Sequence, residues 1–276
     1  NLGNPVSQAD DAICGGDVTV LIDSTISADI GFLQNLKKIQ QKKIPFVAVT
    51  SAVRVEGNEY KLSREIVWEG FSYGPENLFA GEVTEKIREM LDRTERQNIF
   101  VFTSGEKGKE SYVILERVSR PPHLIIAGAG HIGKAVCMLG SFLDFEVTVI
   151  DDRPEFTEKT LLPWADHIIT GNIGEALAKA EKDKNTYIVI VTRGHSNDAE
   201  ALKNCIGSDA AYVGMIGSRT KTELMRRDFI SRGWATHEQW EKIHTPIGLR
   251  INSETVGEIA VSIAAELIMV KNSYAI

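Results

Sequence analysis

The sequence LIIAGAGHIGKAV contains three glycines at a spacing that is typical of phosphate binding. Gly128, Gly130 and Gly133 form the pattern G-x-G-x-x-G, after an apolar run and before a helical pattern. Such glycines allow a tight turn and a close approach of the backbone to a phosphate, and the N–H groups at the helix start attract its charge. A second apolar run ends at Asp151, where an acid can hydrogen-bond to ribose hydroxyls. The residues therefore predict a site for a nucleotide-like phosphate.

This motif leaves alternatives open. The glycines could serve only a tight strand–helix turn, although the complete strand–turn–helix context favours a ligand. An acid at Asp151 favours NAD over NADP because it would repel a 2′-phosphate, and Arg153, two residues further on, weakens that preference. His131, inside the loop, would either contact a bound phosphate or lie exposed at the helix start.

A second polar cluster, TRGHSND, follows the apolar run TYIVIV. Ligands of open parallel sheets bind beyond the carboxyl ends of the strands, which places Arg193, His195 and Asp198 near a binding crevice. Asn197 and Glu200 also have the spacing of a helix capping box. Capping does not account for Arg193 or His195, so we interpret these two as candidate site residues.

A third cluster, GMIGSRTK, follows the apolar run AAYV. Gly217 and Ser218 at a helix start, next to Arg219 and Lys221, could bind an anion. The alternative is an ordinary capped helix with a solvated basic first turn.

Two further features lie near the end of the chain. His244 begins the loop HTPIGLRINSET and could approach the same crevice, although a single histidine is more often structural or exposed. Glu258, Ser262 and Glu266 are four residues apart and form one polar stripe on the last helix. Such a stripe is usually solvated, but the rest of this helix is so apolar that Glu266 could instead point into a site.

The chain contains three cysteines, Cys14, Cys137 and Cys205. A low, odd count argues against a disulfide framework and against a four-thiolate iron–sulfur cluster, and it favours a reducing cytoplasm. Cys14 precedes two glycines and an apolar run, so its thiol could bind a soft metal or carry sulfur, or be a passive small residue. Cys137 and Cys205 lie in helical patterns and are expected in the core.

The composition excludes several classes of protein. The formal net charge is −7, which argues against nucleic acid as a partner. No apolar run approaches the ~20 residues of a membrane-spanning helix, and the first residues lack a signal-peptide pattern. We therefore expect a cytoplasmic protein that does not enter a membrane. The first residue is Asn1 rather than Met, which is consistent with a trimmed or incomplete N-terminus.

Two prolines in ERVSRPPH indicate a domain boundary near Pro121. Residues 1–118 are predicted to form a small N-terminal α/β domain, with strands at 17–23, 44–53, 98–104 and 111–118 and helices at 28–43 and 81–93. The last two strands are expected to form a hairpin.

Residues 122–276 are predicted to form a Rossmann-like α/β domain with a parallel sheet covered on both faces, because near-continuous apolar strands alternate with helical patterns. The expected strands are 124–128, 146–151, 167–170, 186–192 and 210–217, and a largely buried helix is expected at 255–272.

Taken together, several blocks resemble the XdhC/CoxI family, the xanthine dehydrogenase accessory proteins. They are AGAGHIGKAV, VIDDRPEF, TRGHSNDAEAL, YVGMIGSRTK, HTPIGL and EIAVSIAAEL, with CGGDVTVLID as a first-domain block. The resemblance implies a Rossmann-like C-terminal domain and a protein that binds and protects the molybdenum cofactor. Such a protein helps a cysteine desulfurase to sulfurate the cofactor and passes it to apo xanthine dehydrogenase or a related molybdenum hydroxylase.

The resemblance also implies roles for single residues and shows departures. Cys14 matches the family's first-domain cysteine, a candidate contact to the cofactor and its metal. The family usually has a further glycine-rich stretch with its own cysteine upstream, which this sequence lacks. Arg250 replaces a usual acid, and Val256 replaces a usual proline. The chain is too short for the domains of xanthine dehydrogenase itself, so it is expected to be a chaperone more than a catalyst.

The leading hypothesis is therefore a chaperone for the molybdenum cofactor, either molybdopterin or its dinucleotide form. The cofactor's phosphate would contact the glycine loop and Gly217 and Ser218, Cys14 would face the metal, and Arg193, His195 and Arg219 would line the site. Alternatives are an NAD-dependent oxidoreductase with His195 as acid–base, and a nucleotide-sensing regulator. A homodimer is expected because symmetric dimers are the commonest assembly.

Overall fold

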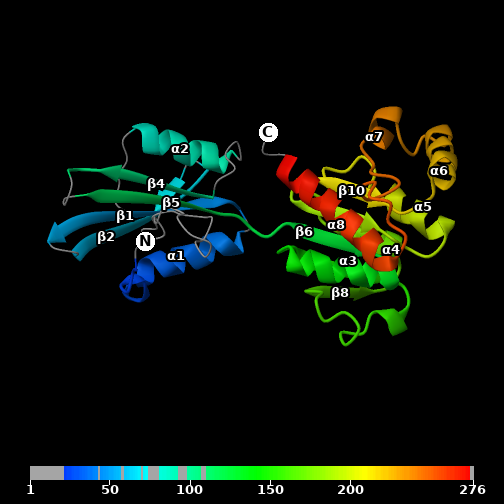
Figure 1. The fold of residues 1–276 in the computed structure, drawn as a ribbon, viewed down its shortest axis with the longest axis horizontal. Helices are drawn as coiled ribbons and strands as arrows, with labels where there is room; N and C mark the ends of the chain where they lie inside the picture. The colour runs from blue at the N-terminus through cyan, green and yellow to red at the C-terminus, as the bar shows by residue number, and fades with distance from the viewer. Residues whose placement is uncertain are drawn as a thin grey trace, which may run out of the picture. The chain divides into compact units, whose positions relative to one another are not determined.

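The computed structural model describes residues 22–42, 44–56, 59–69, 71–73, 81–92, 98–106 and 110–273 (Figure 1). The chain divides into two compact units. Among the described residues, the first unit ends at Ser119 and the second begins at Arg120.

The first unit contains a five-stranded antiparallel sheet with the order β3-β2-β1-β5-β4. Its strands are β1 (Phe46–Glu56), β2 (Glu59–Trp68), β3 (Phe71–Tyr73), β4 (Ile99–Ser104) and β5 (Ser111–Val118). Its helices are the short 3₁₀ helix η1 (Ile26–Ala28), α1 (Ile30–Gln41) and α2 (Gly81–Leu91).

The helices α1 and α2 cover opposite faces of this sheet (Figure 1). Helix α1 packs Phe32 and Ile39 against Phe46 and Ile66. Helix α2 packs against the other face, where the buried residues are Val47, Val49, Val83, Ile87, Met90 and Leu115. The alternation of side chains along β1 explains this division, because successive residues face opposite sides of a strand.

Most predicted elements of the first unit are present. The two helices and the β4–β5 hairpin are confirmed. Residues 17–21 of the predicted first strand lie outside the described residues, and Ile22 and Asp23 belong to no strand. Strand β2 was missed because its middle is buried on both faces, where Arg64 and Glu65 interrupt the expected alternation.

Arg64 fixes the beginning of the described chain to the sheet. Its side chain is only 6% exposed and forms ion pairs with Asp23 and Asp29. It also donates a hydrogen bond to the hydroxyl of Thr25. Burial opposes the charge of Asp23, but hydrogen bonds from Arg64 and Thr25 outweigh it and lower the pKa of this carboxyl. One buried guanidinium thus organises the segment that precedes α1.

The second unit contains a five-stranded parallel sheet with the order β10-β9-β6-β7-β8. Its strands are β6 (His123–Ala127), β7 (Glu146–Asp151), β8 (His167–Thr170), β9 (Thr186–Ile190) and β10 (Tyr212–Met215). This is the strand order of a Rossmann fold, in which the chain changes direction across the sheet between β6 and β9. The predicted Rossmann-like parallel sheet is confirmed, although β9 and β10 are shorter than expected.

Helices cover both faces of the parallel sheet (Figure 1). One face is covered by α3 (His131–Phe142) and α8 (Val256–Ser273), and residues of both helices belong to one apolar cluster. The other face is covered by α4 (Ile173–Lys179), α5 (His195–Lys203), α6 (Arg219–Ser231) and α7 (His237–Glu241). A second 3₁₀ helix, η2 (Pro154–Phe156), follows β7.

None of the helices in the described residues combines the length and the hydrophobicity that a membrane span requires. Cys137 and Cys205 are buried, as predicted. Burial raises the pKa of the Cys137 thiol to about 11 and that of Cys205 to about 12, so both thiols are inert at neutral pH.

Replacement of Arg64 tests the anchoring of the first unit. Arg64→Met should destabilise this unit by roughly 2–3 kcal/mol, because it removes several charge-assisted hydrogen bonds and leaves their acceptors partly buried. Arg54→Met is the matched control, since Arg54 is 22% exposed and pairs with Glu110. The control should cost about 1 kcal/mol or less. Urea-dependent hydrogen exchange of β1 and β2 peptides measures both, and equal losses would contradict the proposed anchor.

Candidate functional site

The three glycines of the phosphate-binding motif have different structural tasks. Gly128 has a φ of +114°, and a Cβ there would lie 2.5 Å from the carbonyl oxygen of Val191. A Cβ at Gly133 would lie 1.9 Å from the carbonyl oxygen of Gly128, so α3 can approach the loop only without a side chain. A Cβ at Gly130 would meet nothing within 4 Å. The loop is therefore packed at its first and third glycines and open at the second.

The open glycine lies at the start of α3, where Gly130 is the N-cap. The first intrahelical hydrogen bond joins the N–H of Lys134 to the carbonyl oxygen of Gly130. The preceding N–H groups of the first turn therefore have no acceptor within the helix and can bind an anion. His131 is the first residue of this helix and is exposed.

Asp151 lies at the end of β7 and is buried. One of its oxygens accepts a 2.6 Å hydrogen bond from the N–H of Ala129, inside the glycine loop. Arg153 donates to both oxygens, at 2.8 Å each, and its guanidinium lies 3.9 Å from the ring centre of Phe156. Burial alone would raise the pKa of Asp151. The hydrogen bonds from Arg153 and Ala129 together have a larger effect, so the pKa of this carboxyl is lowered. A ribose hydroxyl would have to replace Arg153 at this carboxylate.

The segment after β9 lies against the glycine loop. The hypothetical Cβ of Gly128 is within 3.0 Å of backbone atoms of Val191 and Thr192. Arg193 is exposed in this segment. His195 is the first residue of α5, and its side chain lies outside the described residues.

The predicted capping box of Asn197 and Glu200 is wrong. The N-cap of helix α5 is Gly194, three residues before Asn197, and the helix begins at His195. Gly194 has a φ of +98°, which turns the chain sharply and allows the helix to start at His195. The side chain of Glu200 lies beside Gly174 of α4 instead.

Asp198 connects the segments that follow β9 and β10. It is fully buried, and its carboxylate accepts a 2.5 Å hydrogen bond from the hydroxyl of Thr192. Its other oxygen pairs with the ammonium of Lys221 in the first turn of α6. Lys221 was expected near an anion, and in this structure Asp198 holds it.

The segment after β10 has the predicted helix start. Ser218 caps α6, because its hydroxyl accepts a 3.3 Å hydrogen bond from the N–H of Lys221. Gly217 precedes the cap, and Arg219 follows it as an exposed residue. The candidates Gly128, Gly130, His131, Gly133, Asp151, Arg193, Gly217, Ser218 and Arg219 thus all lie at the carboxyl edge of the parallel sheet.

The proposed metal contact, Cys14, lies outside the described residues. Within the ranges that the structure describes, no group of three or more histidine, cysteine or acidic side chains is placed to hold a metal ion. The phosphate site at the sheet edge and the role of Cys14 both stay predictions.

Glu266 is buried in α8 and does not belong to a solvated stripe. Its carboxylate accepts hydrogen bonds from the hydroxyl of Tyr212 at 2.6 Å and the N–H of Gly248 at 2.8 Å. The Nδ1 atom of His244 lies 3.1 Å from its other oxygen. Burial alone would raise the pKa of Glu266. These three hydrogen bonds together have a larger effect, so the pKa of this carboxyl is lowered. Ser262 is buried as well, whereas Glu258 is exposed.

Tyr212 was missed by sequence reasoning. It is the first residue of an apolar strand, and the strand pattern gave no sign that its hydroxyl meets a carboxylate 54 residues further along the chain. The one available signal was the acidic residue Glu266 inside an apolar helix, because a buried acid requires partners.

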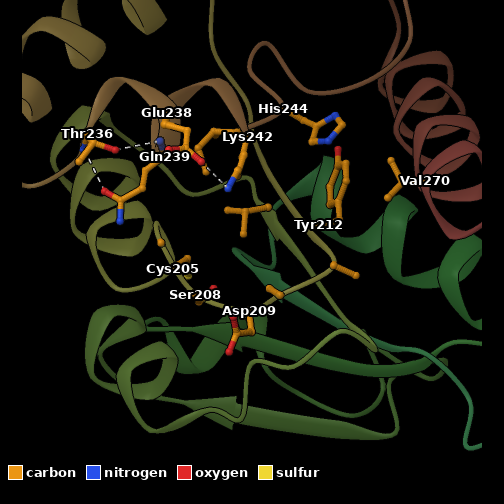
Figure 2. Close-up of a pocket in the computed structure, with 15 residues that line it drawn as sticks. Cys205, Ser208, Asp209, Tyr212, Thr236, Glu238, Gln239, Lys242, His244 and Val270 are labelled. Carbon is orange, nitrogen blue, oxygen red and sulfur yellow. Dashed lines mark hydrogen bonds and ion pairs between the residues drawn. The ribbon is translucent and has the colours of Figure 1, made fainter. Parts of the chain in front are cut away.

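A cavity of about 670 Å³ lies beside the start of β10 (Figure 2). Figure 2 shows the hydroxyl end of Tyr212 directed toward the imidazole of His244, and the two rings have centroids 4.4 Å apart. Cys205 borders the same cavity. Of the sequence-predicted candidates, His244 lines this cavity and those named at the sheet edge do not.

Comparison with known proteins decides the family. The XdhC Rossmann domain matches residues 124–267, which is more than half of the chain. The chain belongs to the XdhC family. The match begins in β6 and ends in α8, and it therefore includes the glycine loop, the segments after β9 and β10, and Glu266.

Three relatives extend this finding. The chain is 27% identical over 229 residues to a probable xanthine dehydrogenase subunit of Bacillus subtilis, covering 83% of this chain and 62% of that protein. It is 31% identical over 153 residues to YqeB, an uncharacterized protein of Escherichia coli, covering 55% of this chain and 28% of YqeB. A crystal structure described as a xanthine dehydrogenase from Bacillus halodurans matches with a TM-score of 0.63 and 25% identity, covering 89% of this chain and 66% of that one. The chain thus spans less than two thirds of each relative.

A matched pair of glycine substitutions distinguishes the packed position of the loop from the open one. Gly133→Ala should destabilise the second unit by about 3 kcal/mol, because its Cβ would overlap the carbonyl oxygen of Gly128. Gly130→Ala should change stability by no more than about 0.5 kcal/mol, because its Cβ meets open space and its φ of −67° suits alanine. Urea unfolding measures both. A large loss in Gly130→Ala would contradict the open position.

Acid stability tests the Glu266 hydrogen bonds. Because the folded pKa is lowered, the carboxylate stabilises the fold fully above its unfolded pKa of about 4.3 and loses this effect as the pH falls through the folded value. Glu266→Gln should therefore have a lower Tm than the wild type at neutral pH, and the difference should shrink as the pH falls. Glu254→Gln, on the exposed segment before α8, is the control. A pH-independent difference would contradict the assignment.

Proposed function

We propose that this protein binds the molybdenum cofactor and assists its sulfuration and insertion into a xanthine dehydrogenase or a related molybdenum hydroxylase. The observation that carries the proposal is the glycine loop, packed at Gly128 and Gly133 and open at Gly130, in a chain of the XdhC family. The open position faces the unsatisfied N–H groups of α3, which suits a phosphate.

The described residues fit the phosphate end of this cofactor. The N–H groups at the start of α3 would bind the phosphate oxygens, and His131 lies exposed beside them. Arg193 and Arg219, from the segments after β9 and β10, would add positive charge from the other side of the crevice. Asp198 fixes the separation of these two segments through Thr192 and Lys221.

The metal end of the cofactor is assigned to Cys14. When bound, the cofactor would supply the molybdenum centre on which the client enzyme depends. The thiolate of Cys14 would contact the metal or its sulfur, because thiolates suit soft ligands. His195 is proposed as a further cofactor contact at the start of α5.

Partners are proposed from the names of the relatives and from the family. The Bacillus subtilis relative is described as a probable xanthine dehydrogenase subunit, which supports a molybdenum hydroxylase as the client. A cysteine desulfurase would supply the sulfur, and a homodimer is the proposed assembly.

The second candidate is an NAD-dependent oxidoreductase. The Rossmann strand order and the acid Asp151 favour it. Against it, Arg153 occupies the carboxylate to which a ribose would hydrogen-bond. The terminal phosphate of the molybdopterin form needs no such replacement, so the occupied acid favours that form of the cofactor over NAD.

Titration of the purified protein with molybdenum cofactor and, separately, with NAD tests the proposal. We expect binding of the molybdenum cofactor that weakens by at least about tenfold in Gly130→Asp, because a carboxylate at the open position would repel the phosphate. Cys14→Ala should weaken it as well. Gly257→Asp is the control, at an exposed glycine in the first turn of α8 with open space around it and no positive φ.

Two outcomes would overturn the proposal. Binding of NAD alone would assign the glycine loop to a dinucleotide and favour the oxidoreductase. Unchanged binding of the molybdenum cofactor by Gly130→Asp would remove the loop from the cofactor site, provided that the variant has the wild-type Tm.

A further inference from the structure

The residue His244 is held rigidly beside strand β10. Its N–H donates to the carbonyl oxygen of Val213 at 3.0 Å, and its own carbonyl oxygen accepts from the N–H of Met215 at 3.0 Å. The N–H of Ile247 donates to the carbonyl oxygen of Met215, and Gly214 pairs with His244 in parallel. This segment therefore lies against the sheet like a further short strand. The backbone from which the imidazole projects is held in place by these hydrogen bonds.

The imidazole is also fixed at one of its two nitrogens. Nδ1 lies 3.1 Å from a carboxylate oxygen of Glu266, which is buried and accepts two further hydrogen bonds. A carboxylate can only accept, so Nδ1 must carry the hydrogen. In the neutral imidazole, Nε2 then has the free electron pair. Among the described residues nothing hydrogen-bonds to Nε2, and the side chain of His244 is 30% exposed.

A groove of about 690 Å³ lies at this position, and His244 and Glu266 both line it. Arg219 and Arg250 lie on the same groove and are exposed. Within the part of the chain that the structure describes, neither guanidinium forms an ion pair. Two unpaired arginines beside a histidine favour an anionic ligand, and guanidinium groups match phosphate geometry well.

We propose that His244 is the proton acceptor of an acid–base site in this groove, with Glu266 and Tyr212 as positioning residues. The ligand is a small molecule with a phosphate group, which Arg219 and Arg250 bind, and with an O–H or S–H group that reaches Nε2. The proton moves from that group to Nε2. The products are an imidazolium that keeps its Nδ1–H bond to Glu266, and an oxygen or sulfur anion on the ligand.

The inference rests on the proposed function only for the identity of the ligand, because Arg219 is assigned both to the cofactor site and to the acid–base site. If the ligand is the molybdenum cofactor, the groove receives the part of it that lies beyond the glycine loop. The tautomer of His244 and the affinity of the groove for phosphate can be measured without that cofactor.

The first experiment determines the tautomer by NMR. Long-range ¹H–¹⁵N spectra of the ¹⁵N-labelled full chain report the protonated nitrogen of each of the six histidines, and His244→Gln assigns the signal. We expect neutral His244 to carry its hydrogen on Nδ1, and Glu266→Gln to lose this preference. Tyr212→Phe should keep it, because the carboxylate remains. An Nε2–H tautomer in the wild type would overturn the proposal, whether or not Glu266→Gln folds.

The second experiment uses inorganic phosphate as the probe. Phosphate should shift the Nε2 resonance of His244, and the double variant Arg219→Gln, Arg250→Gln should raise the phosphate dissociation constant by about tenfold or more. Arg227→Gln is the control, because Arg227 lies on the same helix but pairs with Glu223 outside the groove. No phosphate shift, or an equal shift in the double variant, would overturn the proposal.

The two proposals can fail separately. If the Nδ1–H tautomer and the phosphate response are present but the molybdenum cofactor does not bind, the proposed function fails and the acid–base site stands. If the cofactor binds through Gly130 while His244 has the Nε2–H tautomer, the proposed function stands and the acid–base site fails.

Discussion

The close approach of α3 to the end of β6 determines the geometry of the second unit. Gly133 lies so near the carbonyl oxygen of Gly128 that any side chain would overlap it. This contact brings the first turn of α3, whose first N–H groups have no acceptor within the helix, to the carboxyl edge of the sheet. Asp151 then holds the loop through the N–H of Ala129, and Val191 closes it on the other side. The position of the glycine loop at this edge follows from one backbone contact.

A second constraint is the burial of two carboxylates, each of which connects a different set of segments. Asp198 joins the segments after β9 and β10 through a hydroxyl and an ammonium group. Glu266 joins α8 to β10 and to the segment after α7 through Tyr212, Gly248 and His244. Buried acids are stable only when their oxygens are satisfied, so each one fixes the loops that supply its donors. The loops at this edge are thus positioned by charge as well as by packing.

The sequence predicted the parallel sheet well, because buried parallel strands are continuous apolar runs and the glycine motif marks the first strand–helix turn. It predicted the antiparallel sheet less well, because β2 carries Arg64 and Glu65 in its buried middle. The location of Gly130 and of Ser218 could be read from local patterns. The partners of Asp198 and Glu266 could not be read from local patterns. Lys221 lies far from Asp198 along the chain, as Tyr212 does from Glu266, and only the tertiary fold brings each pair together.

The pair formed by Asp151 and Arg153 acts as an internal substitute for a ligand. The guanidinium satisfies the buried acid, so the crevice contains no uncompensated carboxylate. A ligand phosphate at the glycine loop leaves this ion pair intact, whereas a ribose hydroxyl at Asp151 must displace the guanidinium of Arg153. The ion pair therefore lowers the affinity for the second kind of ligand and leaves that for the first unchanged. Selectivity at this edge would then depend on an exchange of partners and not on an open pocket of fixed shape.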